Sequence, residues 1–311
     1  MRGRAAGGWG ARRACRRHGA SLGPVRRVLL VLLATVTAAA VTVAVAEERH
    51  SDRPAARAAD PLPAPDAALP REPARLAATL TATTRRLRAA LRRWDPATRV
   101  PRDVTYLALH HQRLLRFMAA RRTLGNATLA RLPGDVRGEA RDTVLGRRDL
   151  AAIPRSRRPP PVRVAAAAPA AELRRDYAAA QRRFGVHWSV LASINFVESA
   201  FGRVRSASEA GARGPMQFLP STWRRYGMGG DIEDPHDAIL GAANYLQHAG
   251  AASSLDRALF AYNHSTSYVR AIRRFAARMR SDARTFLTYY AWQVFVRAPN
   301  GSRRLTGPGR A

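Results

Sequence analysis

The chain has 311 residues, and its 53 basic residues, all of them arginine, outnumber 22 acidic ones, so its formal net charge is +31. A charge of this size favours a polyanionic partner such as nucleic acid, anionic lipid or a bacterial wall polymer. The arginines are spread along the chain, with eight in residues 1–46, 25 in residues 47–169 and 20 in residues 170–311. Nucleic-acid binding needs a localised basic stripe or a recognisable binding module. The sequence has neither, so we expect no nucleic-acid partner.

An uncharged apolar segment, residues 28–46, follows an arginine-rich head. Its end, Ala44-Val45-Ala46, has the small-x-small pattern of a signal-peptide cleavage site. A segment of this length is also long enough to span a bilayer, with the basic head kept inside. Residues 1–46 are therefore predicted to be a basic head plus a signal peptide or an uncleaved signal anchor. Both alternatives place residues 47–311 outside the cytoplasmic membrane, either secreted to the wall or anchored to its outer face.

Two segments rich in alanine and proline, residues 47–73 and 151–170, are predicted to be linkers, because such compositions favour extended spacers. Between them, residues 74–150 carry leucines at helical spacing and predict a small helical module. Its dense arginines indicate either a wall-binding surface or a solvated basic face. The pair His110-His111 predicts no metal site, because adjacent helical residues face different ways.

Residues 171–297 also have the apolar spacing of helices, and no segment alternates like a strand over a useful length. Asp234-Pro235 has the pattern of a helix start, with a capping carboxylate and proline at the first helical position. We predict an all-α chain that ends in a disordered tail, residues 298–311. Because the second linker transmits no rigid packing, residues 171–297 are predicted to fold and act alone.

One carboxylate in this region has the context of a general acid. Glu198 lies one position from an apolar helical stripe, and partial burial raises a carboxyl pKa towards the range that proton donation at neutral pH requires. A solvent-exposed helical glutamate is the alternative. Three segments of its surroundings favour the acid: Glu198-Ser-Ala-Phe-Gly202, Gly214-Pro-Met-Gln-Phe-Leu-Pro-Ser-Thr-Trp223 and Ala261-Tyr-Asn263.

These three segments resemble, in order, spacing and residue type, the core motifs of the lytic transglycosylases with a lysozyme-like (SLT-type) domain. The resemblance covers about residues 172–297, and the module before it matches actinobacterial members loosely. It implies an all-α fold with a lysozyme-like catalytic domain preceded by the helical module. It also implies that the enzyme cleaves the MurNAc-GlcNAc β-1,4 bond of peptidoglycan and leaves 1,6-anhydro-MurNAc ends.

The resemblance implies particular roles for residues of the three motifs. Glu198 would be the sole catalytic acid and base, Met216 and Gln217 would line the saccharide groove, Tyr262 would brace the glutamate, and Asn263 would contact substrate. Their motif neighbours Ser199 and Phe218 are further candidates for substrate binding. We expect no cofactor and no metal, and we expect peptidoglycan glycan strands as partner, with anionic wall polymers and, through an uncleaved anchor, the membrane as further partners.

Two other functions fit the same motifs. A lysozyme-like muramidase would hydrolyse the same bond and needs a second carboxylate, for which Glu209, Asp231 and Asp234 are candidates. A non-catalytic wall-binding scaffold would only grip glycan, although such a binder has no use for a partly buried acid. The mass of the cleavage products separates the first two activities, because anhydro ends weigh one water less than hydrolysed ends.

Overall fold

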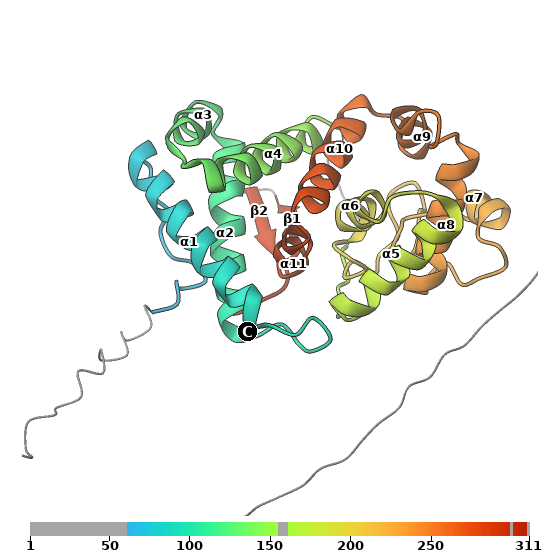
Figure 1. Ribbon diagram of the computed structural model, residues 1–311, viewed down its shortest axis with the longest axis horizontal. Helices are drawn as coiled ribbons and strands as arrows, with labels where there is room; N and C mark the ends of the chain where they lie inside the picture. Colours follow the sequence, from blue (N-terminus) through green and yellow to red (C-terminus); the bar gives the residue numbers. More distant parts are fainter. Residues whose placement is uncertain (1–60, 155–160, 299–300, 310–311) are drawn as a thin grey trace, which may run out of the picture. The chain divides into compact units, whose positions relative to one another are not determined.

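A computed structural model describes residues 61–154, 161–298 and 301–309 of the chain. The described residues are mostly helical, which confirms the predicted all-α fold. The elements in chain order are α1 (Pro73–Arg93), α2 (Arg102–Ala120), α3 (Arg122–Arg131), α4 (Gly134–Ala151), α5 (Ala170–Phe184), α6 (Trp188–Ser199), α7 (Pro220–Tyr226), α8 (Pro235–His248), α9 (Leu255–Tyr262), α10 (Thr266–Ser281), α11 (Arg284–Tyr290), β1 (Phe295–Ala298) and β2 (Gly301–Arg304) (Figure 1).

Some helices begin at a residue whose side chain caps the first turn. The Glu72 carboxylate accepts the backbone N–H groups of Ala74 and Arg75 at the start of α1. Asp234 accepts the N–H of Asp237 at the start of α8, as its sequence pattern predicts. Each such cap pairs a backbone donor that has no partner inside the helix. The caps therefore fix where these helices begin before any packing is considered.

Helices α1 to α4 pack on one another, and their buried face continues into the second half of the chain. Helix α4 lies alongside α10 (Figure 1). Gly146 of α4 makes this close approach possible, because a Cβ atom there would lie 2.8 Å from the ring of Phe275. Deeper in the same joint, Thr143 and Tyr289 of α11 share a 2.7 Å hydrogen bond between their hydroxyls. The helical module is thus packed against the following helices.

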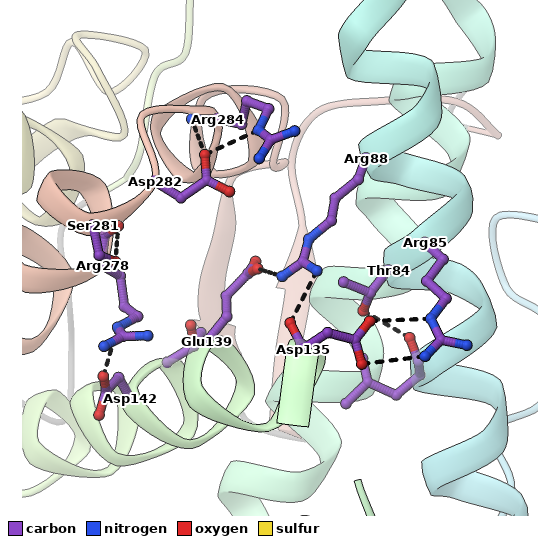
Figure 2. Close-up of polar contacts among 12 residues, drawn as sticks. Thr84, Arg85, Arg88, Asp135, Glu139, Asp142, Arg278, Ser281, Asp282 and Arg284 are labelled. Carbon is purple, nitrogen blue, oxygen red and sulfur yellow. Dashed lines mark hydrogen bonds and ion pairs between the residues drawn. The ribbon is translucent and has the colours of Figure 1, made fainter. Parts of the chain in front are cut away.

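Ion pairs flank this apolar joint, and Figure 2 shows one of them, between Asp142 and Arg278, together with pairs that join α1 to α4. Asp142 of α4 lies 2.7 Å from the Nε atom of Arg278, although that N–H is not aligned on the carboxylate as a hydrogen bond requires. Asp149 of α4 accepts hydrogen bonds from Arg270 at 3.0 Å and Arg274 at 3.2 Å. The carboxylates on this face of α4 are therefore engaged by arginines of α10.

The described part of the second predicted linker is packed rather than extended into solvent. The described part of the second linker lies against the following helices: Ala165 donates its N–H to the carbonyl of Arg203 at 2.9 Å, and the Tyr290 hydroxyl donates to the Ala168 carbonyl. All described residues fall within one compact unit, 59–311. The predicted domain boundaries remain predictions, but packing between α4 and α10 crosses the second linker.

We predicted that residues 298–311 form a disordered tail, and this prediction is wrong for the described residues that form a strand. Strands β1 and β2 pair antiparallel, with Phe295 opposite Arg304. Beyond them, the Thr306 hydroxyl accepts the backbone N–H of Val294. Gln112 of α2 exchanges two 2.9 Å hydrogen bonds with the backbone of Gln293 just before the hairpin. Side-chain hydrogen bonds from α2 therefore hold the C-terminal hairpin.

The predicted signal peptide or anchor, residues 1–46, and most of the first linker lie outside the described residues. Within the described part, no helix combines the length and the apolar character that crossing a membrane requires.

Candidate active site

The site is built around the C-terminal end of α6, where Glu198 is half-buried. The helix stops because Ala200 and Phe201 both take left-handed backbone conformations, with φ of 52° and 64°, and Gly202 follows at 78°. Two non-glycine residues in this region are strained, and such strain persists only where the surroundings hold it. Here the ring of Phe201 is buried and packs edge-on against Phe286, with ring centroids 5.4 Å apart.

A buried polar network ties this helix end to the loop that carries the second motif. The Ser199 hydroxyl accepts the N–H of Gly202 at 2.7 Å and donates to the carbonyl of Pro215. Asn195 also donates to the Pro215 carbonyl, at 2.8 Å, and accepts the hydroxyl of Tyr177 at 2.6 Å. Since buried polar groups must be paired, this network fixes the loop relative to Glu198.

The loop after Gly214 is a tight turn. Gly214 has a φ of 75°, and a Cβ atom there would overlap the carbonyl of Ile232. Gln217 takes a left-handed conformation with a φ of 51°, and its side-chain amide donates to the carbonyl of Gly214 at 3.0 Å. Gln217 is half-buried, so it retains an exposed part that substrate can reach.

Three of the predicted substrate-binding side chains are instead buried. The exposed fraction is 1% for Ser199, 0% for Met216 and 4% for Phe218. Their side chains shape the backbone of the site, because a side chain without exposed surface offers no contact to a ligand in a groove. Asn263, at the end of α9, is half-buried and keeps an accessible part.

A tyrosine that the sequence analysis missed contacts the glutamate. The hydroxyl of Tyr268 donates a 2.7 Å hydrogen bond to Oε1 of Glu198. The predicted brace, Tyr262, donates instead to the carbonyl of Met216, at 2.6 Å. Tyr268 lies in the first turn of α10, whose N-cap is Ser265. A buried aromatic in a helix has no local signal that separates this role from core packing.

Both phenols are suited to donate at neutral pH. Burial, and next the Glu198 carboxylate, raise the pKa of Tyr268 well above its usual range. The same two causes, in the same order, raise the pKa of Tyr262. A phenol with a raised pKa stays protonated and keeps its hydrogen for donation. Tyr268 therefore holds one carboxylate oxygen, while Tyr262 holds the loop.

An open cavity of about 340 Å³ lies beside Glu198. Its walls come from α6, from Gln112 and Arg116 of α2, from Arg147 of α4 and from the C-terminal hairpin. Glu198 is the single acidic residue among those that line it. The helices of the N-terminal module thus form part of the wall next to the candidate acid.

The candidates for a second carboxylate lie elsewhere. Asp231 accepts the N–H of Glu233, and Asp234 caps α8, so both carboxylates are engaged in backbone turns. Glu209 is exposed, and none of the three lines the cavity beside Glu198. In the described part of the chain, no three His, Cys, Asp or Glu side chains gather as metal ligands would.

Two comparisons with known proteins find similarity in the part of the chain that holds Glu198. Residues 177–283 match the family model of the transglycosylase SLT domain. The membrane-bound lytic murein transglycosylase F of Thiobacillus denitrificans is 33% identical over 119 residues, which are 36% of this chain and 25% of that relative. No solved structure matches the chain. The chain spans about a quarter of that relative's length, and its residues 177–283, which run from α5 past the end of α10, are similar to an SLT transglycosylase domain.

Proposed function

We propose that the protein is a peptidoglycan lytic transglycosylase that cleaves the MurNAc-GlcNAc β-1,4 bond with Glu198 as its single acid and base. The observation that carries the proposal is the position of Glu198: a half-buried carboxylate, held by the Tyr268 hydroxyl, that is the single acidic residue lining an open cavity. The match to the SLT domain and the transglycosylase relative support the same reaction.

In this reaction Glu198 first gives its proton to the glycosidic oxygen, and the bond between that oxygen and C1 of MurNAc breaks. The N-acetyl group of the same sugar stabilises the cationic centre at C1. Glu198, now a carboxylate, takes the proton of the sugar's own 6-hydroxyl as that oxygen bonds to C1. The product is a 1,6-anhydro ring, Glu198 regains its proton, and no water is consumed. A second carboxylate, which hydrolytic glycosidases use, has no step to perform.

The surrounding residues position this chemistry. Tyr268 orients the carboxylate, and the Ser199 network with Tyr262 sets the loop that carries Gln217. Gln217 and Asn263, which keep accessible surface, are the proposed contacts to the glycan. We propose that the enzyme acts outside the cytoplasmic membrane, where its substrate lies, and that residues 1–46 direct it there.

The Glu198→Gln variant tests the proposal, because glutamine keeps the shape of the side chain but has no transferable proton. General acid–base assistance is worth about two to four powers of ten in rate, so cleavage should fall by that factor while glycan binding is retained. Release of soluble fragments from purified walls measures cleavage, and sedimentation with the walls measures binding. An Asp231→Asn variant, which alters an acid of the α8 turn, is the matched control and should keep its activity. Substantial cleavage by Glu198→Gln would place the acid elsewhere.

A further inference from the structure

Six arginines lie along a pair of adjoining cavities next to Glu198. The second cavity, of about 790 Å³, shares Arg116, Arg147 and Phe295 with the cavity beside Glu198. We call the arginine-lined walls of the two cavities the arginine trough; its arginines are Arg113, Arg116, Arg121, Arg122, Arg147 and Arg148. They come from α2, α3, α4 and the residue between α2 and α3, and the hairpin contributes Phe295.

Arginines outnumber acidic residues along the walls of the trough. Among the described residues, no acidic residue lines the second cavity and Glu198 is the single one that lines the first. The nearby carboxylates of α4, Asp142 and Asp149, are turned to arginines of α10. These two carboxylates are therefore engaged by α10.

Arg116, which lies where the two cavities meet, is held by an aromatic ring. Its guanidinium lies 4.2 Å from the centre of the Phe295 ring, and neither a hydrogen bond nor an ion pair to it occurs among the described residues. Burial lowers its pKa to about 10, so it stays charged at neutral pH. Nearby, Nη1 of Arg113 is buried without a hydrogen-bond partner in the described part of the chain. Partly buried guanidinium groups in this state are suited to an anionic ligand, because they match carboxylate and phosphate oxygens in pairs.

We propose that the arginine trough binds the carboxylates of the peptide side chains that the glycan strand carries. This proposal rests on the proposed function, because the strand must enter the cavity of Glu198. Each muramic acid bears its peptide on the lactyl group, so a strand held at Glu198 brings a carboxylate-bearing branch to the trough. The branch is tethered to the bound strand, which gives it a high effective concentration there. A separate phosphate polymer lacks that tether, and we therefore favour the peptide.

A binding experiment tests the trough without any cleavage. The probe is N-acetylmuramoyl-tetrapeptide, titrated into the full chain carrying Glu198→Gln, with binding measured by calorimetry. Adding Arg116→Gln should weaken binding about tenfold, the loss expected for one charge-assisted hydrogen-bonding group. Arg122→Gln, at an exposed position of the trough, is a second variant that leaves the core untouched and should also weaken binding. The control Arg141→Gln removes one exposed charge from α4 outside the trough and should leave binding unchanged.

Two other outcomes would overturn the proposal. Equal binding by the control, Arg116→Gln and Arg122→Gln variants would show that the trough does not hold the peptide. A second titration uses polyglycerol phosphate; if the trough variants weaken its binding and leave that of the muropeptide intact, the ligand is a phosphate polymer instead.

Cleavage separates this proposal from the proposed function. The chain with an intact Glu198 is given strands that carry peptides and strands freed of them by an amidase. The ratio of kcat/KM for the two substrates should favour peptide-bearing strands, and Arg116→Gln should lower that ratio about tenfold. If Arg116→Gln remains active and leaves this ratio unchanged, the proposal for the arginine trough is wrong, while the proposed function still stands. Loss of anhydro product from both substrates in the unmodified chain would overturn the proposed function, whereas the calorimetric result would still stand.

Discussion

The Glu198 carboxylate is held by a neutral phenol, and this affects how its proton can move. Tyr268 donates to one carboxylate oxygen at 2.7 Å, and its raised pKa keeps the donor hydrogen in place at neutral pH. The hydrogen bond therefore orients the carboxyl group through both of its protonation states, the acid that donates and the base that later accepts.

Removing that hydrogen bond should slow cleavage more than it weakens binding. Tyr268→Phe keeps the buried ring and deletes the hydroxyl; a hydrogen bond to a charged group is worth about 1.5–3 kcal/mol, so we expect kcat to fall roughly ten- to hundredfold with little change in KM. Rates on peptide-bearing strands measure this. The matched control is Tyr289→Phe, which deletes the buried hydroxyl that is hydrogen-bonded to Thr143. This control should lower the stability of the protein and leave its activity unchanged. Unchanged kcat in Tyr268→Phe would mean that the phenol does not orient the acid.

At the residue scale, the sequence predicts the parts of the site that lie in local motifs. The context of Glu198 and the glycine-bounded loop at Gly214 are found from neighbouring residues, and Gln217 is a candidate because the motifs resemble those of a known family. Tyr268 could not be found in this way, because it meets Glu198 across 70 positions of the chain. Ser199, Met216 and Phe218 belong to the motifs for a different reason from the one predicted: they are buried and hold the backbone of the site.

At the scale of elements, the packing of α4 on α10 depends on the absence of a side chain at Gly146. Replacing a helical glycine by alanine ordinarily stabilises a protein by about 0.5–1 kcal/mol. Here the new Cβ atom would lie 2.8 Å from the ring of Phe275, which is buried and packs edge-on against Phe196 and Tyr289. Overpacking of this kind costs about 1–3 kcal/mol. We expect this steric cost to exceed the usual gain from replacing a helical glycine by alanine.

We therefore predict that Gly146→Ala lowers the free energy of unfolding by about 1–2 kcal/mol, as measured by urea denaturation. Gly134→Ala, at the first residue of the same helix, is the matched control, because a Cβ atom there meets nothing within 4 Å. The control should be neutral or slightly more stable. A Gly146→Ala variant that is as stable as the control would show that α4 and α10 are further apart than described.

The elements were predictable where their ends carry local signals. Asp234 begins a helix and Gly185 ends one, as capping rules require. The C-terminal hairpin was not predicted. Its strands are only four residues long and gain their stability from α2, through the bonds between Gln112 and Gln293. Such support is invisible in a local pattern.

At the scale of the whole molecule, the two halves of the described chain depend on each other. The second linker alone predicts that residues 171–297 fold and act independently. The packing predicts otherwise, because removing α1 to α4 would expose Phe275, unpair Tyr289 from Thr143 and take away one wall of the cavity beside Glu198. Dispersed arginines on separate helices also converge only in the folded molecule, which is why the sequence shows no basic patch.

We expect residues 171–297 alone to unfold at a lower temperature and less cooperatively than residues 61–311, and to cleave walls poorly. Circular dichroism on heating and fragment release from purified walls are the two measurements. Residues 61–311, which hold all described elements, serve as the control. A fragment 171–297 with the same melting curve and the same rate would show that the N-terminal helices are dispensable for the site.

Mass spectrometry of the products tests whether one glutamate cleaves glycan strands without consuming water. Purified peptidoglycan is digested with the full chain and, in parallel, with the Glu198→Gln variant. We expect the new ends released by the unmodified chain to be 1,6-anhydro sugars, lighter by one water than reducing ends, and we expect the variant to release almost none. Reducing ends that take up ¹⁸O from labelled water would contradict this expectation, because they would show a hydrolase that uses a second catalytic group.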